Sequence, residues 1–221
     1  MTTLLVDKTE LSIPSWVVDL DSFQRWTEVP DFPQKADVWW LRGGVWADMS
    51  MEQIFSHVDV KGEFYRVLAN LLIETGQGRV FTDGLRLFNE KAELSGKPDA
   101  TFISNESRQE GRVALVPGKE EGFTHVYGSP DMVLEVVSPS SERKDLVTLR
   151  EDYFVAGVRE YWLVDARKSP PKFSILRRNS VAFIATRNQG GWVKSSVFGK
   201  SFRLRQTVDE FDTPVFRLDV R

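Results

Sequence analysis

The stretch SPDMVLEVVSPSSERKD, residues 129–145, decides the fold, because it contains an apolar run with the features of a buried strand. Side chains alternate along a strand, so Asp131, Val133 and Glu135 share one face and the apolar residues between them share the other. Apolar residues on both faces are typical of a central strand that is covered on both sides. A carboxylate is costly to bury without a partner. We therefore expect Glu135 to lie in the core or at a cleft, beside a group that compensates its charge.

Two helices are predicted, one before and one after this strand. Residues 51–78 form the stronger one, because apolar side chains recur there at spacings of three and four. Residues 139–157 form the second, with Ser140 or Ser141 as N-cap and Gly157 as its end. The two patterns predict one helix on each face of a sheet.

The remaining segments favour β-structure, with an irregular, locally helical N-terminus over residues 1–37 and a less ordered insert over 105–128. The predicted β segments are a hairpin over 37–49, strands over 79–90, 97–104 and 159–166, and several antiparallel strands over 170–221. The order of helices and strands indicates an α/β or α+β fold.

We expect a single domain, residues 1–221, because its length suits one domain of moderate size. Within it, the pattern divides into an N-terminal arm and hairpin over 1–50, a core over 51–168 and a C-terminal β extension over 169–221.

The composition limits the classes of function. The net charge is −3, with 29 basic and 32 acidic side chains, so nucleic-acid binding would have to rest on a local basic patch. The chain has no cysteine, which excludes disulfides and thiolate metal sites. No apolar run approaches the roughly 20 residues that span a bilayer, and the first residues do not have the pattern of a signal peptide. These features predict a cytoplasmic protein without a membrane partner.

Two Pro-Asp pairs, Pro98-Asp99 and Pro130-Asp131, each stand at the start of a predicted strand. If the two strands are neighbours, Asp99 and Glu135 converge, and Mg²⁺ relieves the repulsion because it takes one or two carboxylates and keeps its waters. Such an ion can act on a phosphate ester. The alternative is that Glu135 pairs with an arginine or lysine and each aspartate caps a turn.

Three stretches together, PDATFIS, PDMVLEVVSPSSERKDL and DYFVAGVREYWLVDAR, resemble the Uma-two family of restriction endonuclease-like proteins. That family is a branch of the PD-(D/E)XK nuclease superfamily. The resemblance extends over residues 40–175, because RGGVWADMSMEQIFSHVDVKGEFYRVL is similar to the family's hairpin and first helix. It implies a core of a helix, three strands, a helix and a strand, with added β-strands at both ends.

The resemblance also implies a function and a set of site residues. Asp99 and Glu135 would hold Mg²⁺, with Mn²⁺ as a substitute, in an endonuclease that hydrolyses phosphodiester bonds in DNA. The superfamily often dimerises, which implies a homodimer. Glu63 on the first helix is a candidate third acid, or else a residue of a solvated face. His57 stands where the family often has a histidine, and Asp131 belongs to the motif but better fits a turn at the strand start.

The superfamily places a lysine two residues after the acid of this strand, where the present chain has Val137. A second position, on the following helix, holds Leu149. The substitutes are Arg150, which could bind a phosphate but not accept a proton, and Lys144, near the helix start. Their alternatives are a salt bridge for Arg150 and a solvated position for Lys144. A second hypothesis is therefore a nuclease fold without catalysis that binds nucleic acid or protein.

Overall fold

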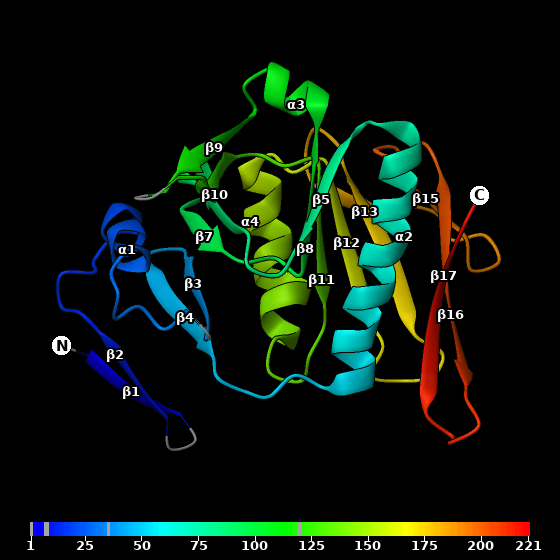
Figure 1. The fold of residues 1–221 in the computed structure, drawn as a ribbon, viewed down its shortest axis with the longest axis horizontal. Coiled ribbons are helices and arrows are strands. Elements are labelled where there is room, and N and C mark those ends of the chain that lie inside the picture. Colours follow the sequence, from blue (N-terminus) through cyan, green and yellow to red (C-terminus); the bar gives the residue numbers. More distant parts are fainter. Residues whose placement is uncertain (1, 7–8, 35, 119–120) are drawn as a thin grey trace.

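A six-stranded sheet in the order β14-β13-β12-β11-β8-β5 forms the centre of the protein (Figure 1). The structure is a computed structural model that describes residues 2–6, 9–34, 36–118 and 121–221. The strands of this sheet are β5 (Gly78–Thr82), β8 (Ala100–Ser104), β11 (Met132–Val136), β12 (Glu160–Asp165), β13 (Lys172–Arg178) and β14 (Phe183–Ala185). Strand β11 is parallel to β12 and antiparallel to β8. The predicted class of fold is confirmed.

The two faces of β11 belong to two different cores. Met132 and Leu134 pack with helix α2 (Val60–Thr75), whereas Val133 packs with helix α4 (Leu149–Ala156). The alternation predicted for this strand is therefore present. Glu135 lies on the same side as Val133, where it meets α4.

A second six-stranded sheet lies beyond α4, in the order β4-β3-β7-β6-β10-β9 (Figure 1). Its strands are β3 (Asp37–Leu41), β4 (Gly44–Asp48), β6 (Arg86–Asn89), β7 (Leu94–Gly96), β9 (Val113–Pro117) and β10 (Phe123–Gly128). The hairpin predicted over 37–49 is confirmed as β3 and β4. The less ordered insert predicted over 105–128 is wrong, because this segment forms helix α3 (Asn105–Gln109) and two paired strands, β9 and β10. Strand β3 pairs with β7, so the segment 1–50 shares a sheet with the segment 51–168.

The N-terminal part of the chain adds the paired strands β1 (Thr2–Val6) and β2 (Thr9–Ile13) and the helix α1 (Leu20–Thr27). The prediction for this part is right about a helix and wrong about irregular structure where the two strands form. The 3₁₀ turn η2 (Glu90–Ala92) lies between β6 and β7. No helix in the described ranges is long and apolar enough to cross a membrane.

Both central helices begin with a π-helical turn and end at a glycine. The turns are η1 (Ile54–Asp59) before α2 and η3 (Lys144–Thr148) before α4. Gly76 and Gly157 end the helices with φ of 62° and 87°, in the left-handed region that glycine adopts without strain.

The N-cap of the second helical segment differs from the prediction. Ser138 Oγ accepts a hydrogen bond from Ser141 N at 3.0 Å, so Ser138 is the cap in place of Ser140 or Ser141. Pro139 then stands at the first helical position, where its fixed φ and missing N–H are suited.

The C-terminal tail forms an antiparallel sheet, as predicted, in the order β15-β16-β17. Its strands are β15 (Val193–Lys194), β16 (Ser201–Val208) and β17 (Pro214–Val220). Together with α2 it covers one face of the central sheet, where Trp162 contacts the rings of Phe64 and Phe202. The opposite face of this small sheet is turned outward.

The carboxylate of Glu160, fully buried at the start of β12, fastens the loop before β16 to the central sheet. Its Oε1 accepts hydrogen bonds from Ser196 N at 2.6 Å, Ser196 Oγ at 2.7 Å and Val197 N at 3.2 Å. Its Oε2 accepts from Ser195 Oγ at 2.6 Å and Trp162 Nε1 at 3.0 Å. Five donors therefore depend on one side chain.

We expect Glu160→Ala to lower the free energy of unfolding by about 3 kcal/mol, because several buried donors lose their acceptor at once. Urea denaturation followed by tryptophan fluorescence measures this change. The control is Glu74→Ala on the exposed side of α2, which should change stability by less than about 0.5 kcal/mol. Equal denaturation midpoints for the two variants would contradict the role given to Glu160.

Candidate active site

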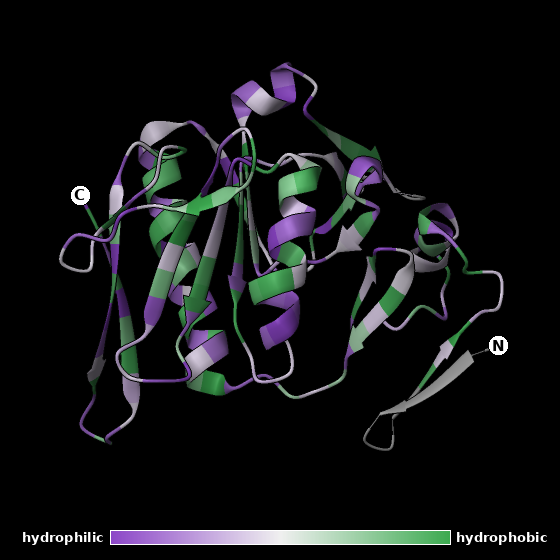
Figure 2. Ribbon diagram, turned by 180° about the vertical axis from the view of Figure 1, so that it is seen from behind, coloured by the Kyte–Doolittle hydropathy of each residue, from purple (hydrophilic) through white to green (hydrophobic). Residues whose placement is uncertain are grey.

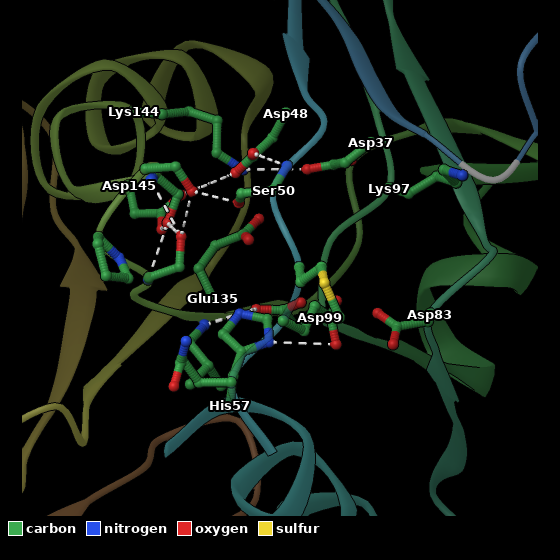
Figure 3. A pocket seen from close by; sticks show the side chains of 18 of the residues that line it. Asp37, Asp48, Ser50, His57, Asp83, Lys97, Asp99, Glu135, Lys144 and Asp145 are labelled. Carbon is green, nitrogen blue, oxygen red and sulfur yellow. Dashed lines mark hydrogen bonds and ion pairs between the residues drawn. The ribbon is translucent and has the colours of Figure 1, made fainter. Parts of the chain in front are cut away.

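A cavity of about 490 Å³ lies between the β3–β4 hairpin and the strands β8 and β11 (Figure 3). Its lining is rich in charge. The ionisable side chains that line it are Asp37, Asp48, Glu52, His57, Asp83, Lys97, Asp99, Glu135, Lys144 and Asp145. Seven carboxylates against two lysines give the cavity an excess of negative charge.

Glu135 lies inside this cavity with 2% of its surface exposed. Its Oε1 accepts a hydrogen bond from the Tyr153 hydroxyl of α4 at 2.6 Å. Burial raises the pKa of Glu135 well above its ordinary value; the Lys144 charge opposes this shift and the Asp99 charge adds to it. Figure 3 shows Glu135 between Lys144 on one side and Asp99 with His57 on the other. The compensating group expected from the sequence is therefore Lys144.

Asp99 reaches the same cavity from the start of β8. Its Oδ2 accepts a hydrogen bond from Val136 N at 2.6 Å, which ties it to the residue next to Glu135. His57 Nε2 lies 3.7 Å from Oδ2, and Lys61 Nζ lies 3.4 Å from Oδ1. Burial raises the pKa of Asp99, while His57 and Lys61 act in the opposite direction. Asp99 and Glu135 thus meet because their strands are neighbours.

Lys144 is buried in the cavity wall, with 5% of its side chain exposed, and is not a solvated lysine. Its Nζ lies 3.2 Å from Asp145 Oδ1, and 4.3 Å and 4.7 Å from the ring centres of Trp39 and Trp46. Burial alone would lower the pKa of Lys144, but the carboxylates around it, Glu135 first, raise it above its ordinary value. Lys144 is therefore protonated at neutral pH.

Both sequence positions at which the resemblance implied a lysine are filled by buried apolar residues, Val137 and Leu149. Arg150, the other proposed substitute, does not reach the cavity. Its Nη2 donates to the carbonyl oxygen of Phe183 at 3.0 Å. Leu149 and Tyr153 occupy the buried face of α4, so Arg150 lies on the exposed side of the helix.

Glu63 and Asp131 also lie away from the cavity. Glu63 is buried, not on a solvated face, and its Oε1 accepts from Leu218 N at 2.9 Å. Asp131 accepts from Ser104 N at 2.7 Å and from Ser107 Oγ at 2.8 Å, so it fixes the turn between β8 and α3.

The sequence reasoning missed three charged residues around the two acids. Lys61 donates to Glu52 at 2.9 Å and to Asp83 at 2.8 Å. Its position four residues after His57 was an available signal, since that spacing puts both on one helix face. Asp145 follows Lys144, and burial raises its pKa to about 6, against the opposing effect of Lys144. Asp37 has no local signal, because the pairing of β3 with a distant strand brings it to the cavity.

The donor set fits a divalent cation that keeps much of its hydration. Within the described ranges, no three His, Asp or Glu side chains are grouped so that they alone could hold a metal ion. Mg²⁺ commonly takes only one or two carboxylates and retains several waters. Asp99 and Glu135 line one cavity and can supply these two carboxylates.

A family model described as "Putative restriction endonuclease", Uma2, matches residues 20–220. The chain belongs to the Uma2 family. The resemblance of the sequence to the Uma-two family, which is the same family, is thus confirmed. A similar fold occurs in a crystal structure from Anabaena variabilis ATCC 29413, titled "putative nuclease belonging to DUF820". The two share 15% sequence identity with a TM-score of 0.61, over 82% of this chain and 91% of the other. No curated protein matches the sequence.

Membership of the Uma2 family places this chain among nuclease-like proteins, a group that generally uses divalent metals. Asp99, Glu135 and Lys144, which line the cavity, come from segments inside the matched range.

Proposed function

We propose that this Uma2 protein is an Mg²⁺-dependent endonuclease that hydrolyses phosphodiester bonds of DNA in the cavity around Glu135. One observation carries the proposal: two buried carboxylates on neighbouring strands, Asp99 and Glu135, share an open cavity with a buried, protonated lysine, Lys144. Such a group of ionisable side chains is costly to bury, and a catalytic use accounts for that cost.

Asp99 and Glu135 would hold Mg²⁺, or Mn²⁺ in its place. When bound, the ion supplies Lewis-acid polarisation of the phosphoryl oxygens. His57 lies beside the candidate ligand Asp99, with its ring nitrogens 3.7 Å from the Asp99 carboxylate and 3.4 Å from that of Glu52.

Lys144 takes the part of the lysine that the strand lacks. In the hydrolysis the oxygen of water bonds to phosphorus while one P–O ester bond breaks, and negative charge grows on the phosphoryl oxygens. The Lys144 ammonium, held by Asp145 and the rings of Trp39 and Trp46, stabilises that charge from a fixed position. Because its pKa is raised, it acts as a cation and not as a proton acceptor.

The test is the cleavage of supercoiled plasmid DNA with Mg²⁺, Mn²⁺ or EDTA. We expect cleavage only with a divalent cation, and a loss of about 10³-fold in Asp99→Asn, because one of two carboxylates is neutralised. The variant keeps an oxygen that can accept from Val136 N, so the fold is retained. Arg150→Gln, a change outside the cavity, is the control and should stay within about twofold of wild type. Metal-dependent cleavage that survives in Asp99→Asn would contradict the proposal.

A second candidate function, a nuclease fold that binds without cutting, is favoured by one observation. Val137 and Leu149 are both buried and apolar at the two positions where the resemblance implies a lysine. This candidate predicts nucleic-acid or protein binding without cleavage by any divalent cation, and binding that Glu135→Gln leaves unchanged.

A further inference from the structure

The net charge of −3 conceals a strong separation of charge along the chain. Residues 166–221 contain twelve Lys and Arg and only four Asp and Glu, a net charge of +8. Residues 1–165 carry the opposite excess, −11. Half of these basic residues lie between positions 167 and 187, and the segment that forms the C-terminal sheet, residues 192–221, contains six Lys and Arg and four Asp and Glu.

On this sheet the basic side chains lie on one face. Phe202, Phe216 and Leu218 point inward and belong to the core that α2 shares. The residues between them point outward, and Figure 2 shows hydrophilic and hydrophobic residues alternating along these strands. We call the outward basic residues of this sheet and its edge the arginine face: Lys194, Arg203, Arg205, Arg217 and Arg221.

The strand register places two of these cations directly opposite each other. Arg205 pairs with Arg217 in the ladder between β16 and β17. Like charges at such a position destabilise a sheet. Asp219 compensates Arg205, whereas Arg217 adds a second positive charge opposite it.

Few carboxylates are placed to neutralise the arginine face. Asp219 is the acid that shares it on β16 and β17, and it already accepts from Arg203 at 2.9 Å and from Arg205 at 2.6 Å. Glu63 lies near Arg217 at the edge of β17, but it is buried and bonded to Leu218 N and Arg66. Asp209, Glu210 and Asp212 are confined to the turn at the end of the hairpin. Several positive charges thus stay available to an anion.

The aromatic residue beside this face is already engaged by the protein. The guanidinium groups of Arg203 and Arg221 lie 4.6 Å and 4.2 Å from the ring centre of Trp192. Phe202 and Phe216 are buried on the inner side. Proteins that bind single strands present free aromatic rings on which bases stack, and this face offers none among its described residues. A contact with a charged backbone is the better match.

We propose that the arginine face binds the phosphodiester backbone of duplex DNA. The preference for a polyanion rests on the charges and their register; the choice of DNA rests on the proposed nuclease function. Arginine suits this task because its planar group remains charged and makes paired hydrogen bonds to phosphate oxygens. The face would hold the duplex by contacts that are independent of sequence.

The test measures binding of a short fluorescein-labelled duplex by anisotropy in EDTA, so that no cleavage occurs, from about 50 to 200 mM salt. The variant Arg205→Gln/Arg217→Gln removes the opposed pair. We expect the slope of log K against log salt to fall in magnitude by about 2 and the affinity to fall at least about tenfold. The matched control, Arg25→Gln/Lys91→Gln, removes two exposed positive charges from the N-terminal part and should bind as wild type does.

Stability distinguishes loss of contact from loss of fold. The double variant removes a repulsive pair but also the exposed ion pair of Arg205 with Asp219, so its melting temperature should stay close to that of wild type. Unchanged affinity and slope in the double variant would overturn the proposal, as would equal losses in the control. A preference for single-stranded over duplex DNA would overturn the assignment to duplex DNA.

The same variants separate this proposal from the nuclease function. If Glu135→Gln loses cleavage but binds normally while the double variant binds weakly, both stand. If the double variant binds weakly but wild type cleaves no DNA, the arginine face binds DNA and the nuclease function is wrong. If wild type cleaves DNA with a divalent metal but the double variant binds normally, the nuclease function stands and the role of the arginine face is wrong.

Discussion

Glu135→Gln is expected to abolish DNA cleavage, by about 10³-fold or more, while the protein remains as stable as wild type or becomes more stable. The glutamine keeps an oxygen that can accept from the Tyr153 hydroxyl, and it removes a buried group whose ionisation burial opposes. Residues that a site needs but the fold does not commonly show this opposition between activity and stability. Plasmid cleavage and urea denaturation of the same preparations measure the two effects, and Mn²⁺ titration calorimetry shows whether the ion is still bound.

The dependence on pH gives this prediction a second readout. Burial raises the pKa of Glu135 above its ordinary 4.5. In the pH range between the ordinary pKa and the raised pKa, the folded state therefore binds more protons than the unfolded state. The contribution of Glu135 to stability therefore declines as pH rises through that window. Glu135→Gln should flatten this decline. A variant that is less stable than wild type at pH 7, with an unchanged pH profile, would show that the ionised carboxylate serves the fold.

Lys144→Gln is expected to reduce cleavage by about 10²- to 10³-fold and also to destabilise the protein by about 3 kcal/mol at pH 7.5. The second effect arises because buried carboxylates, Glu135 and Asp145 among them, lose their common cation. Lowering the pH protonates these acids, so the loss of stability should shrink toward pH 5; the pKa of Asp145 is about 6 even with the lysine present.

The comparison for this prediction is Lys97→Gln, which removes the other lysine that lines the cavity. Lys97 donates to the backbone oxygen of Gln34 and not to a carboxylate, so the stability change caused by Lys97→Gln should vary little between pH 5 and 8. Denaturation midpoints from pH 5 to 8 measure both variants. If Lys144→Gln cleaves as well as wild type does, Lys144 is a structural counter-ion only.

Local patterns predicted the centre of this fold well. The alternation in β11 and the glycines after α2 and α4 act within a few residues of one another. The segment 105–128 was mistaken for a less ordered insert because its short strands contain charges and glycines, and only pairing with distant strands makes them regular.

The residues of the candidate site also divide into those that a local motif marks and those that only the tertiary structure brings together. Asp99, Glu135 and His57 could be selected from the sequence because a motif marks their positions, and all three line the cavity. Arg150 appeared equivalent to Lys144 in sequence, yet only tertiary packing decides which of two nearby cations faces inward. Asp37 could not be found at all, since a sheet pairing carries it there.

The two π-helical turns make the direction of the cavity side chains sensitive to the length of the chain. Each turn contains residues of the cavity: His57 lies in η1, and Lys144 and Asp145 lie in η3. A π turn spans five residues where an α turn spans four, which makes it equivalent to a one-residue insertion in a helix. Loss of a single codon in the 144–148 segment would rotate its side chains by about 100° relative to α4. The length of that segment, and not only its composition, thus decides whether the ammonium group faces Glu135.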